Sequence, residues 1–222
     1  MIELKNISKS FGTREILKNI NFCVEEGDLV SIMGKSGSGK TTLLNILGFF
    51  EYPTKGEYYF DGKLVKKENQ MSRIRNQNMG FVFQAYNLIP RLTVYENIVL
   101  PIFYSLDKKK KKERLKNAEE LINRYGLGEI RNSFVENISG GEKQRACMIR
   151  ALVCDAKLII SDEPTGNLDE KNKSNALEMF KEMNKAGKTV IIVTHDKEVE
   201  NIATKKYILK EGELIKNEMA TN

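Results

Sequence analysis

A glycine-rich stretch at residues 30–42, VSIMGKSGSGKTT, constrains the fold of this chain more than any other feature of its sequence. It has the spacing of a phosphate-binding loop: Gly34, four further residues, then Gly39, Lys40 and Thr41. A short apolar run precedes it, and apolar residues with helical spacing follow it, at Leu43, Leu44, Ile46 and Leu47. This order predicts a strand, a tight loop and a helix, which is the context that such a loop requires.

The residue types in this stretch suit a nucleoside triphosphate. Its glycines let backbone N–H groups point inward, and the start of the following helix adds positive potential. Lys40 can reach the β- and γ-phosphates, and the Thr41 hydroxyl can ligate Mg²⁺. A turn without a ligand is the alternative, but a chance match in a chain of this length is about 1%. The predicted nucleotide-binding residues are Gly34, Lys35, Ser36, Gly37, Ser38, Gly39, Lys40, Thr41 and Thr42.

The rest of the sequence predicts a globular protein of the cytoplasm. With 222 residues, of which 41% are hydrophobic, the chain can bury a substantial core. No apolar run approaches the ~20 residues of a membrane-spanning helix, and the N-terminus lacks the apolar core of a signal peptide. Three cysteines, at 23, 147 and 154, have no metal-type spacing and fit reduced thiols.

The net charge of +6 is compatible with a nucleic acid or an anionic membrane surface as a partner, although it establishes neither. Five consecutive lysines at residues 108–112 contribute much of this excess. Such a block repels itself and is usually a solvated helix start or loop. Contact with lipid headgroups is the main alternative.

Short apolar strands alternate with helical segments, which predicts an α/β fold with a largely parallel, doubly wound sheet. The predicted parallel strands are residues 29–33, 79–83, 157–160 and 189–194. Antiparallel hairpins are expected around residues 12, 61–62 and 211–212. Thr93 is a candidate N-cap for a helix that is expected to end near Pro101.

Polar groups follow four of these strands: the phosphate-binding loop, Gln84, Asp162-Glu163 and His195. Since ligands bind at the carboxyl ends of strands in such sheets, these groups are predicted to converge. Asp162 can hold Mg²⁺ from its second coordination shell, and Glu163 could accept a proton from an attacking water. A cap on the next helix is the alternative for this pair. His195, the single histidine, is favoured as functional because it directly follows a buried strand.

Taken together, these residues resemble the motifs of the ATP-binding cassette (ABC) ATPases over essentially the whole chain. Residues 34–41 resemble the Walker A loop, Gln84 the Q-loop glutamine, and His195 the switch histidine. Residues 158–163 resemble Walker B with its catalytic glutamate, and Asp169 belongs to a D-loop-like NLD. The ABC signature is matched by Ser139, Gly140, Gly141 and Glu142, preceded by isoleucine where leucine is usual, and with Glu142 where glutamine is commoner.

The resemblance implies the P-loop NTPase fold of ABC ATPases, with a doubly wound, mostly parallel sheet, an antiparallel β subdomain and an α-helical signature subdomain. Residues 1–222 would form a single domain, with the helical subdomain at about 86–152. It also implies hydrolysis of ATP with Mg²⁺. The implied catalytic residues are Glu163, His195 and Gln84, and the implied metal-site residues are Thr41, Gln84 and Asp162.

Two further site assignments come from the resemblance. Phe11 could be a core residue or a base-stacking residue on the sequence alone, but it falls where the family has its adenine-stacking aromatic. The resemblance also implies a head-to-tail homodimer in the ATP-bound state. Each ATP would lie between the Walker A loop of one chain and residues 139–142 of the other.

Residues 83–97, 139–145 and 164–169 are similar to the MacB-like and LolD-like branch, which exports macrolides, lipoproteins, bacteriocins and antimicrobial peptides. This implies a subunit on the inner face of the cell membrane that drives a separate permease. Exposed apolar residues within 85–101 would contact the permease, and core packing is the alternative there. A regulatory ATPase of the cell-division type, which transports nothing, is a second possible function. An ABC ATPase acting on nucleic acid is disfavoured, since the chain has neither a second cassette nor a long coiled-coil insertion, so no nucleic-acid partner is expected.

Overall fold

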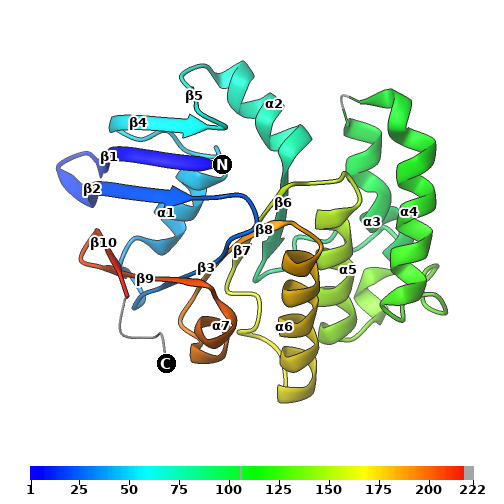
Figure 1. Ribbon diagram of the computed structural model, residues 1–222. Coiled ribbons are helices and arrows are strands. Elements are labelled where there is room, and N and C mark those ends of the chain that lie inside the picture. The colour runs from blue at the N-terminus through cyan, green and yellow to red at the C-terminus, as the bar shows by residue number, and fades with distance from the viewer. Residues whose placement is uncertain (106, 218–222) are drawn as a thin grey trace.

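The computed structural model describes residues 1–105 and 107–217; residue 106 and residues 218–222 of the predicted domain lie outside this range. A six-stranded sheet crosses the centre of the chain (Figure 1). Its strands are parallel except for the edge strand that comes last in the sequence, which pairs antiparallel with its neighbour. The strand order is β10 (Glu213–Lys216), β9 (Lys205–Lys210), β3 (Leu29–Met33), β8 (Thr189–Thr194), β7 (Leu158–Asp162) and β6 (Met79–Phe83).

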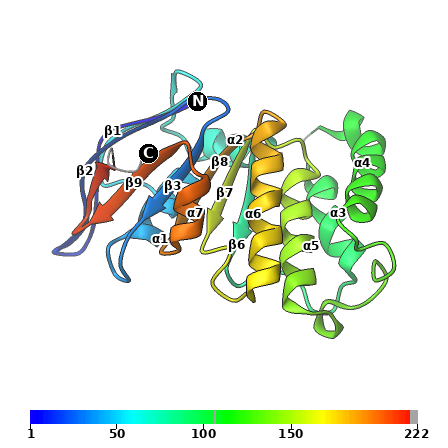
Figure 2. The ribbon, with the colours of Figure 1, turned by 60° about the horizontal axis from the view of Figure 1, so that its bottom comes forward.

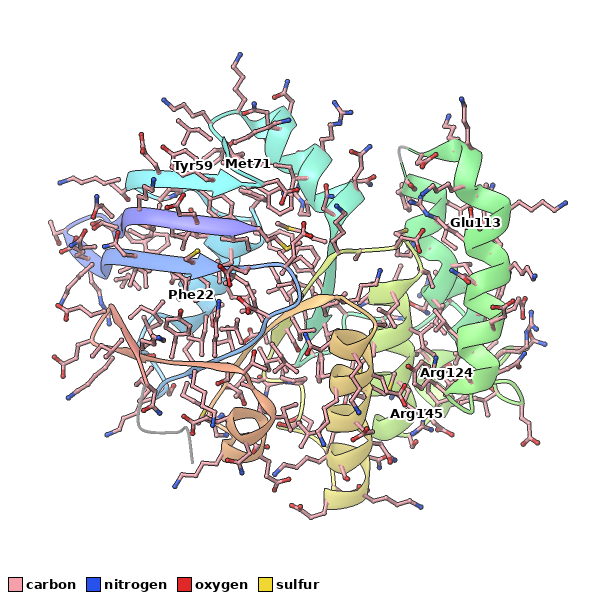
Figure 3. The ribbon with its side chains drawn as sticks, in the orientation of Figure 1. Phe22, Tyr59, Met71, Glu113, Arg124 and Arg145 are labelled. Atoms are coloured by element: carbon pink, nitrogen blue, oxygen red, sulfur yellow. The ribbon has the colours of Figure 1, made fainter. Side chains whose placement is uncertain are left out.

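A second sheet is antiparallel and covers one side of the first (Figure 2). It contains, in spatial order, β2 (Arg14–Val24), β1 (Ile2–Phe11), β4 (Lys55–Phe60) and β5 (Lys63–Leu64). Phe22 of β2, labelled in Figure 3, meets Tyr207 of β9 edge-on, with ring centroids 4.9 Å apart, so aromatic packing joins the two sheets. The predicted fold class, with its parallel sheet and antiparallel part, is confirmed.

Helices cover the parallel sheet because alternate residues of its strands point to opposite faces. On one face, Ile191 and Val193 of β8 join the core formed with α1 (Lys40–Leu47) and the antiparallel sheet. On the other, Val190 and Ile192 join the core of the large helices. These are α3 (Val94–Tyr104), α4 (Lys111–Arg124), α5 (Gly140–Leu152) and α6 (Glu170–Lys185), with short 3₁₀ turns η1 (Lys108–Lys110) and η2 (Val135–Asn137).

The structure corrects the predicted end of one helix. Helix α3 continues through Pro101 to Tyr104 instead of ending near the proline. Proline removes one backbone hydrogen bond, but burial of Val99 and Ile102 on either side of it favours continued helix. Thr93 does cap this helix, as predicted: its hydroxyl accepts a hydrogen bond from the Glu96 amide at 3.2 Å.

Two helices of low hydrophobicity were not predicted, α2 (Glu68–Asn78) and α7 (Lys197–Ile202). Each buries one hydrophobic residue, Met71 in α2 and Val199 in α7, so neither shows an apolar stripe in the sequence. All three cysteines are free, as expected for reduced thiols. Across residues 1–105 and 107–217, no helix combines the length and apolar character needed to cross a bilayer.

Candidate functional site

The pairing of the parallel strands brings the predicted polar groups to one edge of the sheet. Met33, the last residue of β3, pairs with Thr194 at the end of β8. Asp162 at the end of β7 pairs with Val193 on one side and with Phe83 of β6 on the other. The phosphate-binding loop and the residues that follow β6, β7 and β8 therefore leave the sheet together. The convergence predicted from the sequence is confirmed.

The phosphate-binding loop has the backbone geometry that its glycines make possible. Gly39 lies in the left-handed region, with φ of 102°, and forms the N-cap of α1 without any side-chain cap. A side chain at Gly34 would collide with the Leu209 carbonyl oxygen, since a Cβ there would lie 2.8 Å from it. Because no side chain satisfies the first N–H groups of α1, they remain available to an anion.

A cavity of about 410 Å³ opens over this loop. Thr41, Gln84 and Asp162 lie around it, so the three residues implied for the metal site share one space. The sequence did not indicate Arg14 and Ile16, which reach the cavity from the start of β2. No local pattern marks them. The full lining is Arg14, Ile16, Ser36, Gly37, Gly39, Lys40, Thr41, Thr42, Gln84, Asp162 and Glu163.

Lys40 and Glu163 face each other inside this cavity. The Lys40 Nζ donates to the Gly34 carbonyl at 2.8 Å and lies 3.6 Å from Glu163 Oε1, with 12% of each of the two side chains exposed. The other carboxylate oxygen of Glu163 accepts from the Thr194 hydroxyl at 2.9 Å and lies 2.9 Å from His195 Nδ1. The carboxylate is thus held between a cation and a histidine, at a backbone φ of 45° that non-glycine residues rarely adopt.

The oxygen donors at this edge fit Mg²⁺. A carboxylate (Asp162), a hydroxyl (Thr41) and an amide oxygen (Gln84) are hard ligands of the kind that this ion takes together with substrate phosphates. Burial, and then the nearby charge of Glu163, raise the pKa of Asp162, while Lys40 lowers it. A bound cation would oppose the effects of burial and of Glu163 on the pKa of Asp162, because it stabilises the charged carboxylate.

A second polar network holds the residue that follows the histidine, and the sequence did not indicate this network. Asp196, next to His195, accepts a hydrogen bond from the Thr165 hydroxyl at 2.9 Å and pairs with Lys173 at 3.0 Å. Thr165 follows Glu163 by two positions. The segments that carry the carboxylate and the histidine are therefore tied together twice, through Glu163 itself and through Asp196.

Ser139, Gly140, Gly141 and Glu142 lie at the start of α5, outside the cavity over the phosphate-binding loop. In both ribbon views α1 lies on the left and α5 on the right (Figures 1 and 2). The Ser139 hydroxyl donates to Glu142 Oε2 at 2.6 Å, and its oxygen accepts from the Glu142 amide at 3.4 Å. Hydrogen bonds from this hydroxyl and from the Ser139 amide lower the pKa of Glu142.

The remaining predicted site residues also have defined positions. Asp169 caps α6, accepting from the Asn172 amide at 2.8 Å, and a Cβ on Gly141 would collide with the Asn172 side chain. Phe11 lies at the tip of the β1–β2 hairpin with 52% of its surface exposed, which excludes the core alternative. Its ring contacts Lys9, whose Nζ lies 4.9 Å from the ring centroid.

Comparison with known proteins places this geometry in a family. The ABC transporter family model matches residues 17–166. The uncharacterized ABC transporter ATP-binding protein YvrO of Bacillus subtilis is 44% identical, over 98% of this chain and 97% of its own length. The macrolide export ATP-binding/permease protein MacB of Mannheimia succiniciproducens is 42% identical over 97% of this chain. The chain spans 34% of that MacB protein.

Solved structures agree with the sequence relatives. A dimeric structure of the bacterial ABC transporter cassette MJ0796 has a TM-score of 0.85 and 38% identity, with 96% of each chain covered. A dimeric post-hydrolysis state of MJ0796 bound to ADP and Pi has a TM-score of 0.84 and 36% identity, with 98% of each chain covered. Since the matched residues include the phosphate-binding loop, the start of α5 and the strand that ends at Asp162, this chain belongs to the ABC transporter family, in its MacB-like and LolD-like branch, and is an ABC-type ATPase.

Proposed function

We propose that this ABC transporter ATP-binding subunit drives a separate membrane permease that exports or extracts a peptide, a lipoprotein or an antimicrobial compound. It would act from the cytoplasm, on the inner face of the cell membrane. The observation that carries the proposal is the cavity in which Lys40, Glu163 and the free start of α1 meet. Similarity to proteins named as macrolide exporters supports the direction of transport.

The residues of that cavity, together with His195 and Phe11 outside its lining, have distinct tasks in ATP hydrolysis. The loop N–H groups and Lys40 bind the phosphates and stabilise charge that develops on them. Glu163 accepts a proton from the attacking water, and His195 holds the carboxylate in position. Phe11 stacks on the adenine. Thr41, Gln84 and Asp162 would hold Mg²⁺, which would neutralise phosphate charge.

Two chains would form each complete site. Ser139 lies outside the cavity of its own chain, and the MJ0796 cassettes of similar structure are described as dimers. In the homodimer, residues 139–142 of one chain face the ATP held by the phosphate-binding loop of the other, and Asp169 lies at the same interface. The Ser139 hydroxyl, which donates to Glu142 in this structure, turns to donate to a phosphate oxygen.

Ser139→Arg tests this two-chain site. The added cation occupies the position where the partner's nucleotide docks, so dimer formation should be lost and ATP turnover should fall on the order of a hundredfold or more. ATP affinity of the monomer, measured by titration calorimetry, should stay almost unchanged. Asn117→Arg on the exposed face of α4 adds the same charge and should leave turnover intact. A large loss of monomer ATP affinity in Ser139→Arg would place this serine in its own chain's site and overturn the proposal.

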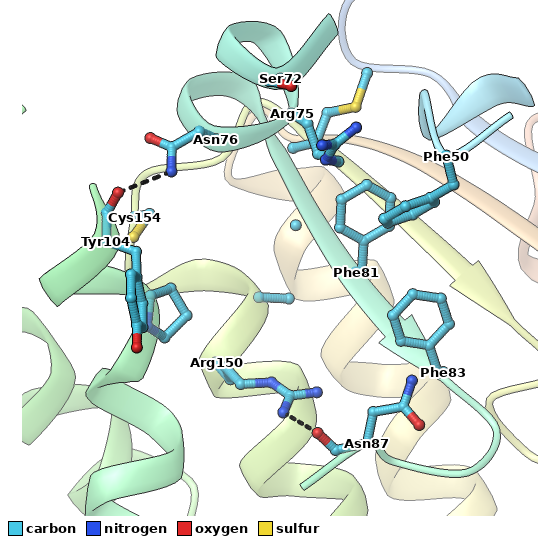
Figure 4. A pocket seen from close by; sticks show the side chains of 14 residues that line it. Phe50, Ser72, Arg75, Asn76, Phe81, Phe83, Asn87, Tyr104, Arg150 and Cys154 are labelled. Atoms are coloured by element: carbon cyan, nitrogen blue, oxygen red, sulfur yellow. Dashed lines mark hydrogen bonds between the residues drawn. The ribbon is translucent and has the colours of Figure 1, made fainter. Parts of the chain in front are cut away.

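The permease would dock in a groove of about 590 Å³ between α2 and β6 on one side and α3 and α5 on the other (Figure 4). Phe50, Phe81 and Phe83 form its apolar wall, with 4.8 Å between the centroids of Phe50 and Phe81. Arg75 and Arg150 add positive charge to the lining. An amphipathic helix with an aromatic or aliphatic face and an acidic residue fits this chemistry.

Residues 85–101 are divided between this groove and the core. Asn87 and Pro101 line the groove, while Val94, Ile98 and Val99 are buried in the helical core. Asn97 is also buried, and its side chain holds the backbone of Ile89 through two hydrogen bonds, at 2.7 and 3.0 Å. Under this proposal, docking applies to the residues that line the groove, and core packing applies to the buried ones.

Arg150 links the groove to the segment that follows Gln84. Arg150 of α5 donates to the carbonyls of Asn87 at 2.5 Å and Tyr86 at 2.7 Å. Tyr86 and Asn87 both have positive φ, 58° and 49°, and directly follow Gln84-Ala85 at the metal site. We propose that the helical residues 86–152 move as one subdomain, so that permease motion at the groove shifts both Gln84 and the start of α5.

Phe50→Glu tests the docking groove. It places a charge on the apolar wall, so permease binding and permease-stimulated ATPase activity should fall at least about tenfold, while ATP binding stays unchanged. Tyr52→Glu is the matched control, since Tyr52 is a similarly exposed aromatic (44% against 49%) that does not line this groove. Both variants are purified from membranes, and the bound integral membrane protein is identified by mass spectrometry. Equal losses in the two variants would reject the groove as the docking site.

A regulatory ATPase of the cell-division type is the second candidate. It would use the same cavity and the same groove, so both sites are compatible with either function. The two functions differ only in whether the permease moves a substrate. ATP-dependent export or extraction by the reconstituted pair supports the transporter. Nucleotide-dependent conformational change without transport of any candidate substrate would favour the regulatory ATPase.

A further inference from the structure

The end of α3 and the start of α4 form an exposed basic and aromatic surface, which is called the lysine tip here. It consists of Phe103, Tyr104 and the five lysines at residues 108–112. Every one of these residues is exposed, and Tyr104, at 71%, is the most exposed large hydrophobic residue in the described part of the chain. In Figure 1 the start of α4 lies at the top of the view, at the same level as α2.

The charge of the lysine tip is not neutralised locally. Within residues 1–105 and 107–217, no ion pair involves lysines 108–112. Lys111 makes a cation–π contact, with its Nζ 4.3 Å from the centroid of the Phe103 ring. The adjacent acidic residues are Asp107 and Glu113, the latter at the start of α4 (Figure 3). Five positive and two negative charges leave +3 on seven consecutive residues.

The backbone that carries these lysines is attached to the helical core through a buried arginine. Arg114, two residues beyond the last of the lysines, is buried, with 5% of its surface exposed. Its guanidinium donates to the Ser105 hydroxyl and to the Cys154 carbonyl, the latter at 3.2 Å, and its Nε lies 3.7 Å from Asp155. Both ends of the lysine tip are thereby joined to the segment that follows α5. A buried arginine costs desolvation free energy, and here its contacts hold the backbone on both sides of the lysines against the segment that follows α5.

The aromatic residues indicate which polyanion fits. Lysines beside exposed Phe and Tyr are the combination that binds at a bilayer surface, where the rings enter the headgroup region and the ammonium groups meet lipid phosphates. Tyr104 also lines the apolar groove between α2 and α3, and its carbonyl accepts a hydrogen bond from Asn76 of α2 at 3.0 Å. The lysine tip and the groove mouth are therefore continuous.

We propose that the lysine tip binds anionic lipid headgroups of the membrane. The interaction needs no permease and no nucleotide, so it goes beyond the transporter function and can be tested separately from it. Each lysine close to an anionic surface strengthens binding about fivefold, and the rings add apolar contact. The attraction falls off within a Debye length, about 10 Å at 0.1 M salt, so it should weaken steeply as salt is raised.

The test is co-sedimentation of the full chain with vesicles of phosphatidylcholine alone, or with roughly one third phosphatidylglycerol. The wild type should bind only the anionic vesicles and dissociate as salt rises from about 0.1 M to about 1 M. Replacing all five lysines at 108–112 by glutamine should lower the partition coefficient at least about a hundredfold. ATP affinity and the thermal unfolding midpoint, measured on the same samples, should not change.

A matched control removes five exposed lysines elsewhere and so gives the same net charge: Lys157, Lys171, Lys185, Lys197 and Lys210, each replaced by glutamine. This variant should still bind anionic vesicles within about threefold of the wild type. Equal losses in the two variants would show that net charge, and not the lysine tip, drives binding. Absence of wild-type binding to anionic vesicles at low salt would overturn the proposal and leave the permease function untouched.

Discussion

Lys40→Ala should abolish ATP hydrolysis, with a loss on the order of a hundredfold to a thousandfold or more, and should severely weaken ATP binding. In the structure the Lys40 ammonium lies between the loop carbonyls and Glu163, in the lining of the cavity proposed for the phosphates. Removing it leaves negative charge from the phosphates and the carboxylate unopposed in a half-buried cavity. Titration calorimetry and phosphate release measure the two effects independently.

Two further variants show whether the losses are specific to the position and to the shape of the Lys40 side chain. Lys157→Ala removes one exposed lysine outside the cavity and should bind and hydrolyse ATP as the wild type does. Lys40→Arg keeps the charge but changes its shape, and it should recover little activity, because a planar guanidinium does not replace a compact ammonium between two carbonyl oxygens. Near-normal ATP affinity in folded Lys40→Ala would count against the nucleotide site as assigned.

Glu163→Gln should keep ATP binding but slow hydrolysis on the order of a hundredfold or more, the usual size of a lost general base. The amide oxygen of glutamine can still accept from the Thr194 hydroxyl and the His195 amide, so the local structure should persist. Lys40 loses its carboxylate partner at 3.6 Å and becomes free to pair with phosphate. The ATP-bound dimer should therefore accumulate, visible as a shift in elution volume when ATP is present.

The control for this dimer is the double variant Glu163→Gln with Ser139→Arg. It retains the same defect in hydrolysis but blocks the proposed interface, so it should remain monomeric with ATP. If Glu163→Gln alone also stays monomeric at saturating ATP, the two-chain site loses its main support. If the double variant dimerises, the interface does not include Ser139.

The family, the fold class and most candidate site residues followed from the sequence, because their signals are local. The spacing from Gly34 to Thr41, the polar residues that end apolar strands and the SGGE at the start of α5 each lie within one short segment. The convergence of Gln84, Glu163 and His195 could also be anticipated, because parallel strands place their carboxyl ends at one edge of the sheet.

Other features depend on contacts between distant segments, and no local pattern encodes them. Arg14 and Ile16 reach the nucleotide cavity only because β2 packs beside the loop before α1. The groove that contains Phe50 and Phe81 forms where α2 and β6 meet helices from later in the chain. Helix α2 itself shows no apolar stripe, because it buries one hydrophobic residue, Met71.

The sequence by itself thus determined which chemistry this protein carries and on which kind of sheet, since residue type and periodicity act over a few residues. Only the tertiary structure decided how these groups face one another. It placed Lys40 3.6 Å from Glu163 and Arg150 within hydrogen-bonding distance of the Tyr86 and Asn87 carbonyls. It also placed Arg114, beside the lysine tip, against the Cys154 carbonyl. These contacts join residues 40 or more positions apart, except within the tip, and they depend on strand register and helix packing that no single segment specifies.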